Sequence, residues 1–210
     1  MPERGNFIGR KVKFLQRVYR RKMGHTFPVR RNKGVLSMSR PSKPTLLAFV
    51  LATVAGACLH FLYEFLPNPL TACLSPVNES LWEHLKLLYW PSAAAFLLLA
   101  RREGRQSLGP RALALLLGCG VMLAAGYVCY ILLDAGNLAF DIVLYVLLMT
   151  GIFLLPPLLP QAWCEKQWEL PVLLAAALGG ALLLFTFLPP RGALFADLSL
   201  TSRYTFFAGM

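Results

Sequence analysis

The sequence predicts an all-α integral membrane protein, a bundle of about five transmembrane helices. The chain has 210 residues, of which 57% are hydrophobic and 15% charged, and a soluble domain of this length has too little interior to bury so much apolar surface. Its apolar runs are rich in Leu and Ala, far longer than strands, and lack the alternation of a β-barrel strand. About 20 such residues cross a lipid bilayer as a helix, so the bilayer is the first expected partner.

Five predicted spans follow one another with short links. We expect them at about 45–66, 81–100, 112–133, 138–159 and 170–188. The second and fourth carry ionisable residues near their starts, so hydropathy alone supports them less than the others. Prolines at 156, 157 and 160 end the fourth span. The last segment is short and polar, which argues against a sixth span. Residues 44–190 therefore form the expected transmembrane domain, and 191–210 a short extracytoplasmic tail.

A basic arm precedes the first span. Residues 1–43 hold 13 of the 21 Lys and Arg residues, and the chain from Met38 onward is nearly neutral. No nucleic-acid partner is expected, because the charge belongs to an arm and not to a folded surface. The arm is either a basic amphipathic segment on an anionic membrane face or, as we favour, a disordered tail. Met38 is an alternative start of the protein.

Basic residues also orient the predicted bundle, because cytoplasmic loops accumulate Lys and Arg. With a cytoplasmic N-terminus, 18 of them fall in inner segments and 2, Arg191 and Arg203, in outer ones. Without the residues before Met38 the count is still 7 against 2. We therefore expect the N-terminus in the cytoplasm and the C-terminus outside.

Ionisable residues gather at the outer leaflet in this topology. His60 and Glu64 are one helical turn apart on the first span and share a face. On the second span, the spacing of Glu79, Glu83 and Lys86 predicts one stripe. Asn78 is expected to cap that helix. Because an ionisable group within a membrane helix is a functional candidate, we predict a cation or proton site formed by His60, Glu64, Asn78, Glu79, Glu83, His84, Lys86 and Asp141.

Three interpretations of this polar layer remain open. In the first, which leads, it binds or relays a cation or proton, with a bound cation as the cofactor. In the second, it is a clamp between the first two spans of a structural or accessory subunit, with a membrane-protein partner or a second copy of the chain. In the third, His60, Glu64, Glu83 and His84 hold the metal ion of a membrane-embedded hydrolase. No HExxH or paired-cysteine motif supports the third, so an enzyme is not the expected class.

Three strings carry a family resemblance: LHFLYEF at 59–65, PVNESLWEHLKLLYWP at 76–91 and FTFLPPRGALFAD at 185–197. They resemble an uncharacterised bacterial family of multi-pass membrane proteins, domain-of-unknown-function family 6512, over about residues 46–198. The resemblance implies a bacterial inner-membrane protein of about five helices and implies no activity. Arg191 stands where the family pattern has a histidine, and the arm before Met38 falls outside the match. The family's residues carry over to His60, Tyr63, Glu64, Pro76, Asn78, Glu79, Trp82, Glu83, His84 and Lys86, and more loosely to Pro189, Pro190 and Asp197.

Overall fold

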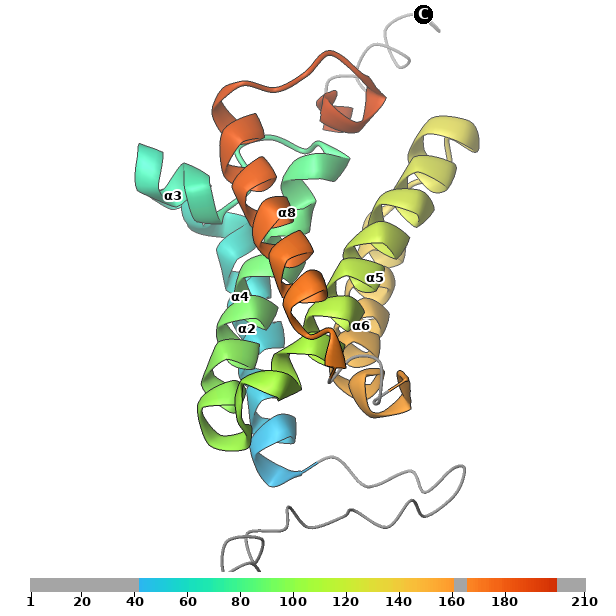
Figure 1. Cartoon of the computed structure of the whole chain (residues 1–210). Coiled ribbons are helices and arrows are strands. Elements are labelled where there is room, and N and C mark those ends of the chain that lie inside the picture. Colours follow the sequence, from blue (N-terminus) through green and yellow to red (C-terminus); the bar gives the residue numbers. More distant parts are fainter. Residues whose placement is uncertain (1–41, 161–165, 200–210) are drawn as a thin grey trace, which may run out of the picture. The chain divides into compact units, whose positions relative to one another are not determined.

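The described part of the chain is all-α, as predicted (Figure 1). The computed structural model describes residues 42–160 and 166–199. The chain divides into two units, 1–38 and 39–210, and every described residue belongs to the second. The expected arm up to residue 41, its alternative start at Met38, and the end of the tail after residue 199 lie outside the described residues.

The described residues of this unit form six α-helices and four shorter helical segments. Each of the five predicted ranges holds one long helix, and the short helix α3 was not expected. The fourth range ends as a helix at Leu154, earlier than predicted, because a 3₁₀ segment begins at Pro156. The helices are α2 (Lys43–Phe65), α3 (Pro69–Leu74), α4 (Leu81–Glu103), α5 (Leu108–Gly126), α6 (Leu138–Leu154) and α8 (Glu169–Phe187). Between and after them lie η1 (Arg105–Ser107), the π-helix η2 (Tyr127–Leu132), η3 (Pro156–Leu158) and η4 (Ala193–Phe195).

The expected cap of α4 was wrong. Ser80, not Asn78, precedes the helix with extended backbone angles, and its hydroxyl accepts the Glu83 N–H at 3.3 Å. The Asn78 side chain instead accepts the N–H of Ser80 at 3.1 Å and holds the turn before the helix. Because α4 begins at Leu81, Glu79 lies outside it. The predicted helical stripe therefore loses its first member.

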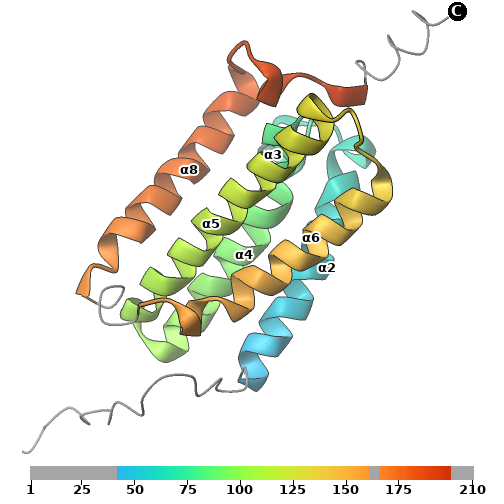
Figure 2. The same cartoon turned by 90° about the vertical axis from the view of Figure 1, so that its right-hand side faces the viewer.

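Helix α4 is central in the bundle and packs against α2, α5, α6 and α8 (Figure 2). The fully buried Leu85 and Leu88 lie on α4 in the same apolar core as Met149 of α6. The Tyr89 hydroxyl donates to the Ala175 carbonyl of α8 at 2.7 Å. These contacts make α4 the helix against which the rest of the unit is positioned.

Three described helical segments are long and apolar enough to cross a membrane: Lys43–Phe65, Arg105–Leu132 and Glu169–Phe187. Only 11%, 33% and 22% of their most apolar windows are buried within the protein, so most of their apolar side chains face outward, and lipid is the solvent that suits such faces. Helix α6 is apolar but shorter, with 17 residues, and α4 carries Glu83 and Lys86. By length and composition, the three long segments are candidate membrane spans.

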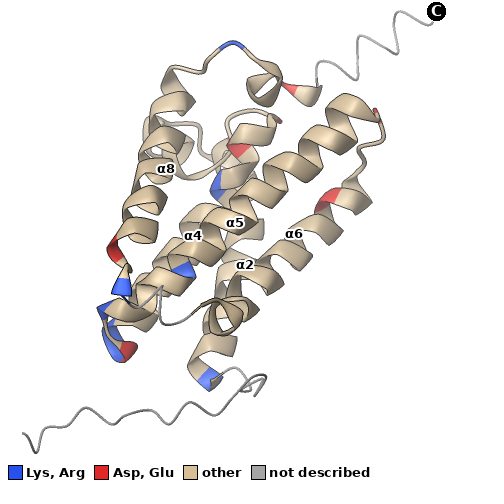
Figure 3. Cartoon of the chain, turned by 45° about the vertical axis from the view of Figure 1, so that its right-hand side comes forward, with Lys and Arg blue, Asp and Glu red and all other residues tan. Residues whose placement is uncertain are grey.

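Charged residues lie mostly towards the two ends of the bundle (Figure 3). Lys43 begins α2, Arg101 and Arg102 end α4, and Arg111 lies in the first turn of α5. At that end, the Arg111 guanidinium pairs with Glu103 at 2.6 Å. We call the opposite end, where α2 ends and α4 and α6 begin, the α3 end, because it carries the short helix α3. The α3 end holds the predicted polar residues.

An aromatic cluster joins the segment after α8 to the start of α4. The ring of Trp82 lies 5.4 Å from that of Phe185 and 5.1 Å from that of Phe195, between centroids. The two phenylalanine rings are 5.7 Å apart. The chain after α8 thus returns to the α3 end.

Candidate functional site

Three of the predicted residues lie together at the α3 end, and we call them the His–Glu group: His60, Glu79 and His84. His60 lies near the end of α2, Glu79 just before α4, and His84 in its first turns. One ligand atom from each of the three lies within 4.8 Å of the others. The imidazole centroids are 5.4 Å apart, and His84 Nε2 lies 3.3 Å from Glu79 Oε2. Two helices and one link therefore bring two nitrogens and a carboxylate to one point.

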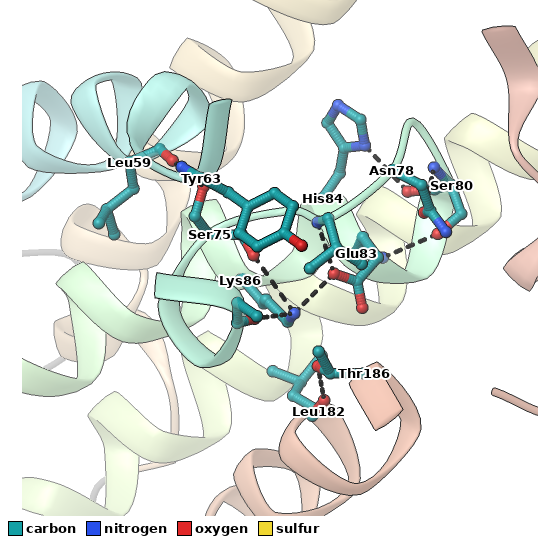
Figure 4. A network of polar contacts seen from close by, with 12 residues as sticks. Leu59, Tyr63, Ser75, Asn78, Ser80, Glu83, His84, Lys86, Leu182 and Thr186 are labelled. Atoms are coloured by element: carbon teal, nitrogen blue, oxygen red, sulfur yellow. Dashed lines mark hydrogen bonds and ion pairs between the residues drawn. The ribbon is translucent and has the colours of Figure 1, made fainter. Parts of the chain in front are cut away.

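The other nitrogen of His84 fixes the orientation and protonation of the ring. His84 Nδ1 lies 2.9 Å from the Ser80 carbonyl oxygen (Figure 4). A carbonyl can only accept, so Nδ1 carries a proton and donates it. Nε2 then holds a lone pair in the neutral ring, or a second proton in the imidazolium. The atom that faces Glu79 is thus the one free to gain a proton or a metal ion.

His60 is half-buried, and its Nδ1 atom is buried without a hydrogen-bond partner. Buried polar atoms are usually paired, and the exceptions often mark a site with a role beyond packing. Glu64, predicted to share the face of His60, is exposed and is not a member of the His–Glu group. The α2 contribution to the group is therefore the imidazole alone.

A buried ion pair lies beside this group on α4, between Glu83, directly before His84, and Lys86. Lys86 Nζ lies 2.6 Å from Glu83 Oε2, and the two side chains are 0% and 4% exposed. The ammonium also donates to the carbonyls of Ala72 at 2.8 Å and Ser75 at 3.4 Å. Glu83 Oε2 accepts the Val77 N–H at 3.0 Å. The pair thus ties the link between α3 and α4 to the start of α4 (Figure 4).

Ser75 joins this link to α2 beside His60. Its hydroxyl donates to the Leu59 carbonyl at 2.5 Å and accepts the Tyr63 N–H at 3.1 Å. Leu59 and Tyr63 are the two residues that a regular α-helix joins by an N–H to carbonyl hydrogen bond. The buried Ser75 side chain therefore bonds to both ends of the helical turn that contains His60. Together with the ion pair, Ser75 fixes α2 and the Glu79 segment relative to each other.

Asp141 lies at the same end but bonds to a different residue. The Tyr130 hydroxyl donates to Asp141 Oδ2 at 2.5 Å. Tyr130 belongs to the π-helix η2, a rare form often found at functional sites. The charge of Asp141 acts on His84 across the space between α6 and α4. Asp141 therefore adds negative potential to the His–Glu group without belonging to it.

The Glu79 carboxylate is held in its ionised form. The hydrogen bond from His84 lowers the pKa of Glu79 below its ordinary value of 4.5, and the charges of His84 and His60 lower the pKa further. Partial burial opposes these two effects but does not outweigh them. At neutral pH the group thus presents a negative carboxylate, ready to accept a cation.

Ser75 and Tyr130 were not predicted as site residues. Ser75 is fully buried, but a lone serine in a link is normally read as turn chemistry. The contact of Tyr130 with Asp141 could not be predicted, because no sequence pattern predicts the π-helix to which Tyr130 belongs. The only signal for Ser75 is its place directly before Pro76 in the string that carries the family resemblance.

The resemblance to a known family is confirmed. The profile of a family of unknown function, DUF6512, matches residues 35–206, which include every described residue of the His–Glu group and of the buried ion pair. No curated protein and no solved structure matches the chain. Because the match spans most of the sequence, this chain belongs to DUF6512.

Proposed function

We propose that the chain is a multi-pass membrane protein that holds a cation, either a proton or a metal ion, in the His–Glu group. One observation carries this proposal: His84 Nε2 faces Glu79 Oε2 at 3.3 Å while His84 Nδ1 is committed to the Ser80 carbonyl. A neutral imidazole would direct a lone pair at a carboxylate, which is repulsive. A proton on Nε2, or a metal ion shared with Glu79, makes the same contact attractive.

The neighbouring ammonium does not supply that positive charge. Lys86 is neutralised by Glu83 and also bonds to two carbonyl groups. The negative charges of Glu79 and Asp141 near His84 therefore favour the binding of a cation from solution. His60 offers a further nitrogen to that cation.

The proposal includes five membrane crossings with a cytoplasmic N-terminus. Five long helices support the number of crossings. The link between α4 and α5, with the turns beside it, carries Arg101, Arg102, Arg105 and Arg111, whereas residues 66–80 carry no Lys or Arg. This asymmetry supports the orientation. The α3 end would then face the outside of the membrane, in bacteria the periplasm.

A second candidate function is supported by the buried ion pair. The Lys86 ammonium and the Oε2 atom of Glu83 are bonded within the protein, as expected for a clamp that locks helices together. A structural or accessory subunit would use the whole polar layer in this way. The unpartnered nitrogen of His60 favours the cation site over this alternative.

The test is thermal melting of the purified full chain in detergent, across pH and with added divalent cations. We expect the wild-type melting temperature to change with pH or with a cation, and His84→Gln to remove most of that change. Glu64→Gln, a carboxylate on the exposed side of α2, is the matched control and should behave as wild type. Identical profiles for all three proteins would leave the clamp as the function.

A further inference from the structure

We infer that the cation is a divalent transition-metal ion of the zinc class, an inference that rests on the proposed cation site. Its ligands would be imidazole nitrogens of His60 and His84 and a carboxylate oxygen of Glu79, whose ligand atoms lie within 4.8 Å of one another. Imidazole suits Zn²⁺, Co²⁺, Ni²⁺ and Cu²⁺. Mg²⁺ and Ca²⁺ are held by oxygen ligands, so two nitrogens out of three ligands argue against them.

A proton alone leaves part of the group unexplained. One proton between His84 Nε2 and Glu79 Oε2 satisfies both atoms at their 3.3 Å separation. It does nothing for His60, whose buried Nδ1 has no partner. A metal ion would engage all three side chains at once.

The His84 ring is oriented as a metal ligand requires. In metal sites the ligating histidine commonly donates its other N–H to a carbonyl or carboxylate, which fixes the tautomer and the direction of the lone pair. The Ser80 carbonyl does this for His84 at 2.9 Å. The same residue caps α4 with its hydroxyl, so the start of the helix and the ligand orientation are set together.

The ligand positions are fixed by bonds that do not involve a metal. Ser75 bonds to both Leu59 and Tyr63 around His60. Glu79 lies between two bonded residues: the Val77 N–H donates to Glu83 Oε2, and the Ser80 hydroxyl accepts the Glu83 N–H. A site held in this way loses little conformational entropy when an ion binds.

The size of the group suits a tetrahedral ion with one open position. Ligand atoms about 2.1 Å from Zn²⁺ lie about 3.4 Å apart in a tetrahedron. The contact between His84 and Glu79 is already 3.3 Å, and the widest separation in the group, within 4.8 Å, must contract by up to about 1.4 Å to reach the tetrahedral value. Three protein ligands leave the fourth position for water or a small anion, as in zinc sites that are not purely structural.

The test uses Co²⁺ and Zn²⁺ as probes on the full chain, purified in detergent with a tag that contains no histidine. Absorption in the visible range reports whether Co²⁺ has a tetrahedral environment, and titration calorimetry gives the affinity and the number of ions per chain. We expect one tetrahedral Co²⁺ per chain, displaced by Zn²⁺ and not by excess Mg²⁺ or Ca²⁺. Glu79→Ala and His84→Ala should each weaken binding by at least about 100-fold, since changes beyond the ligands themselves already cost 10- to 100-fold.

Two variants serve as controls. Glu64→Ala removes an exposed carboxylate from the same end of α2 and should bind Co²⁺ as wild type does. His25→Ala removes the histidine of the basic arm and tests for binding there. Glu79 is half-exposed and outside a helix, so Glu79→Ala should lower the metal-free melting temperature only slightly, and a folded variant that no longer binds Co²⁺ separates lost binding from lost fold.

The outcomes separate this inference from the proposed function. The inference of a metal site is overturned if the wild type shows no tetrahedral Co²⁺, or if Co²⁺ binding survives in both Glu79→Ala and His84→Ala. If melting still depends on pH in the wild type and not in His84→Gln, the occupant is a proton and the proposed cation site stands. If the melting temperature of the wild type depends neither on pH nor on added metal ions, both proposals fail.

Discussion

Two polar clusters beside the start of α4 differ in their burial and in the bonds of their nitrogen atoms. In the ion pair, Glu83 and Lys86 are almost fully buried, and the ammonium contacts a carboxylate and two carbonyl oxygens. In the His–Glu group, His84 and Glu79 are 23% and 52% exposed, and a nitrogen of His60 has no partner. Glu83 directly precedes His84 on α4, so the two clusters are adjacent.

This difference indicates separate roles for residues that the sequence placed in one layer. In the buried pair, the Lys86 ammonium already bonds to three oxygen atoms, so the pair contributes structure. A group with spare acceptors and access from outside can take up an ion. The ion pair and Ser75 therefore position the surrounding segments, and the His–Glu group holds the atoms of the proposed cation site.

Breaking the ion pair should have the largest effect. Lys86→Met leaves the Glu83 carboxylate buried without its partner, which costs about 3–5 kcal/mol of stability. The measurement is the free energy of unfolding in mixed detergent. A double variant, Glu83→Gln with Lys86→Met, should lose less than the sum of the two single variants, because the charge left unpaired in each is then absent. A Lys86→Met protein as stable as wild type would contradict the structural role of the pair.

Ser75→Ala should weaken the site while sparing the fold. Loss of the hydroxyl frees the turn of α2 that bears His60, and we expect Co²⁺ affinity to fall about 10-fold. Ser92→Ala is the matched control, because Ser92 is equally buried on α4 and its hydroxyl contacts Met149 Sδ at 3.6 Å, away from the site. Equal Co²⁺ affinity in the two variants would show that Ser75 does not position His60.

His60→Leu should separate stability from binding. Removing a buried nitrogen that has no partner relieves a desolvation cost, so the metal-free protein should gain about 1 kcal/mol, and the rise in melting temperature on adding Zn²⁺ should vanish. Glu64→Leu, one turn farther along α2, controls for the added apolar surface. A large loss of metal-free stability in His60→Leu would mean that His60 has a structural role in holding the helices together.

The pH dependence from Glu79 should be the smallest effect, because this carboxylate is half-exposed. Its pKa is lowered in the folded protein, so the stability it contributes is fully present above the ordinary value of 4.5 and is lost as the pH falls through the lowered folded pKa. Without metal, the wild-type melting temperature should fall more steeply than that of Glu79→Gln below about pH 4.5. Parallel curves would remove Glu79 from the group.

The long helices were predictable because a membrane permits few alternatives. A run of about 20 apolar residues must form a helix to pair its backbone groups in lipid, and all five ranges hold one. Helix ends were less predictable, since Pro156 ends α6 in a 3₁₀ turn that hydropathy does not register.

The make-up of the site was only partly predictable, and one residue shows why. The spacing of Glu79 and Glu83 suggested a shared face, but this holds only if both lie in one helix. Because Ser80 is the cap, Glu79 is free of the helical spacing and approaches His84. Which of Asn78 and Ser80 caps the helix depends on the bonds of the preceding link to Lys86, and these are tertiary contacts.

The position of Trp82 gives the site an optical reporter within its own chain. Trp82 lies two residues before His84, packed between Phe185 and Phe195. In a variant whose other tryptophans are replaced, its fluorescence would be quenched by a nearby Cu²⁺ or Co²⁺ ion and spared by Zn²⁺, whose filled d shell cannot accept the excitation. Occupancy of the site could then be followed in lipid vesicles that contain this protein alone.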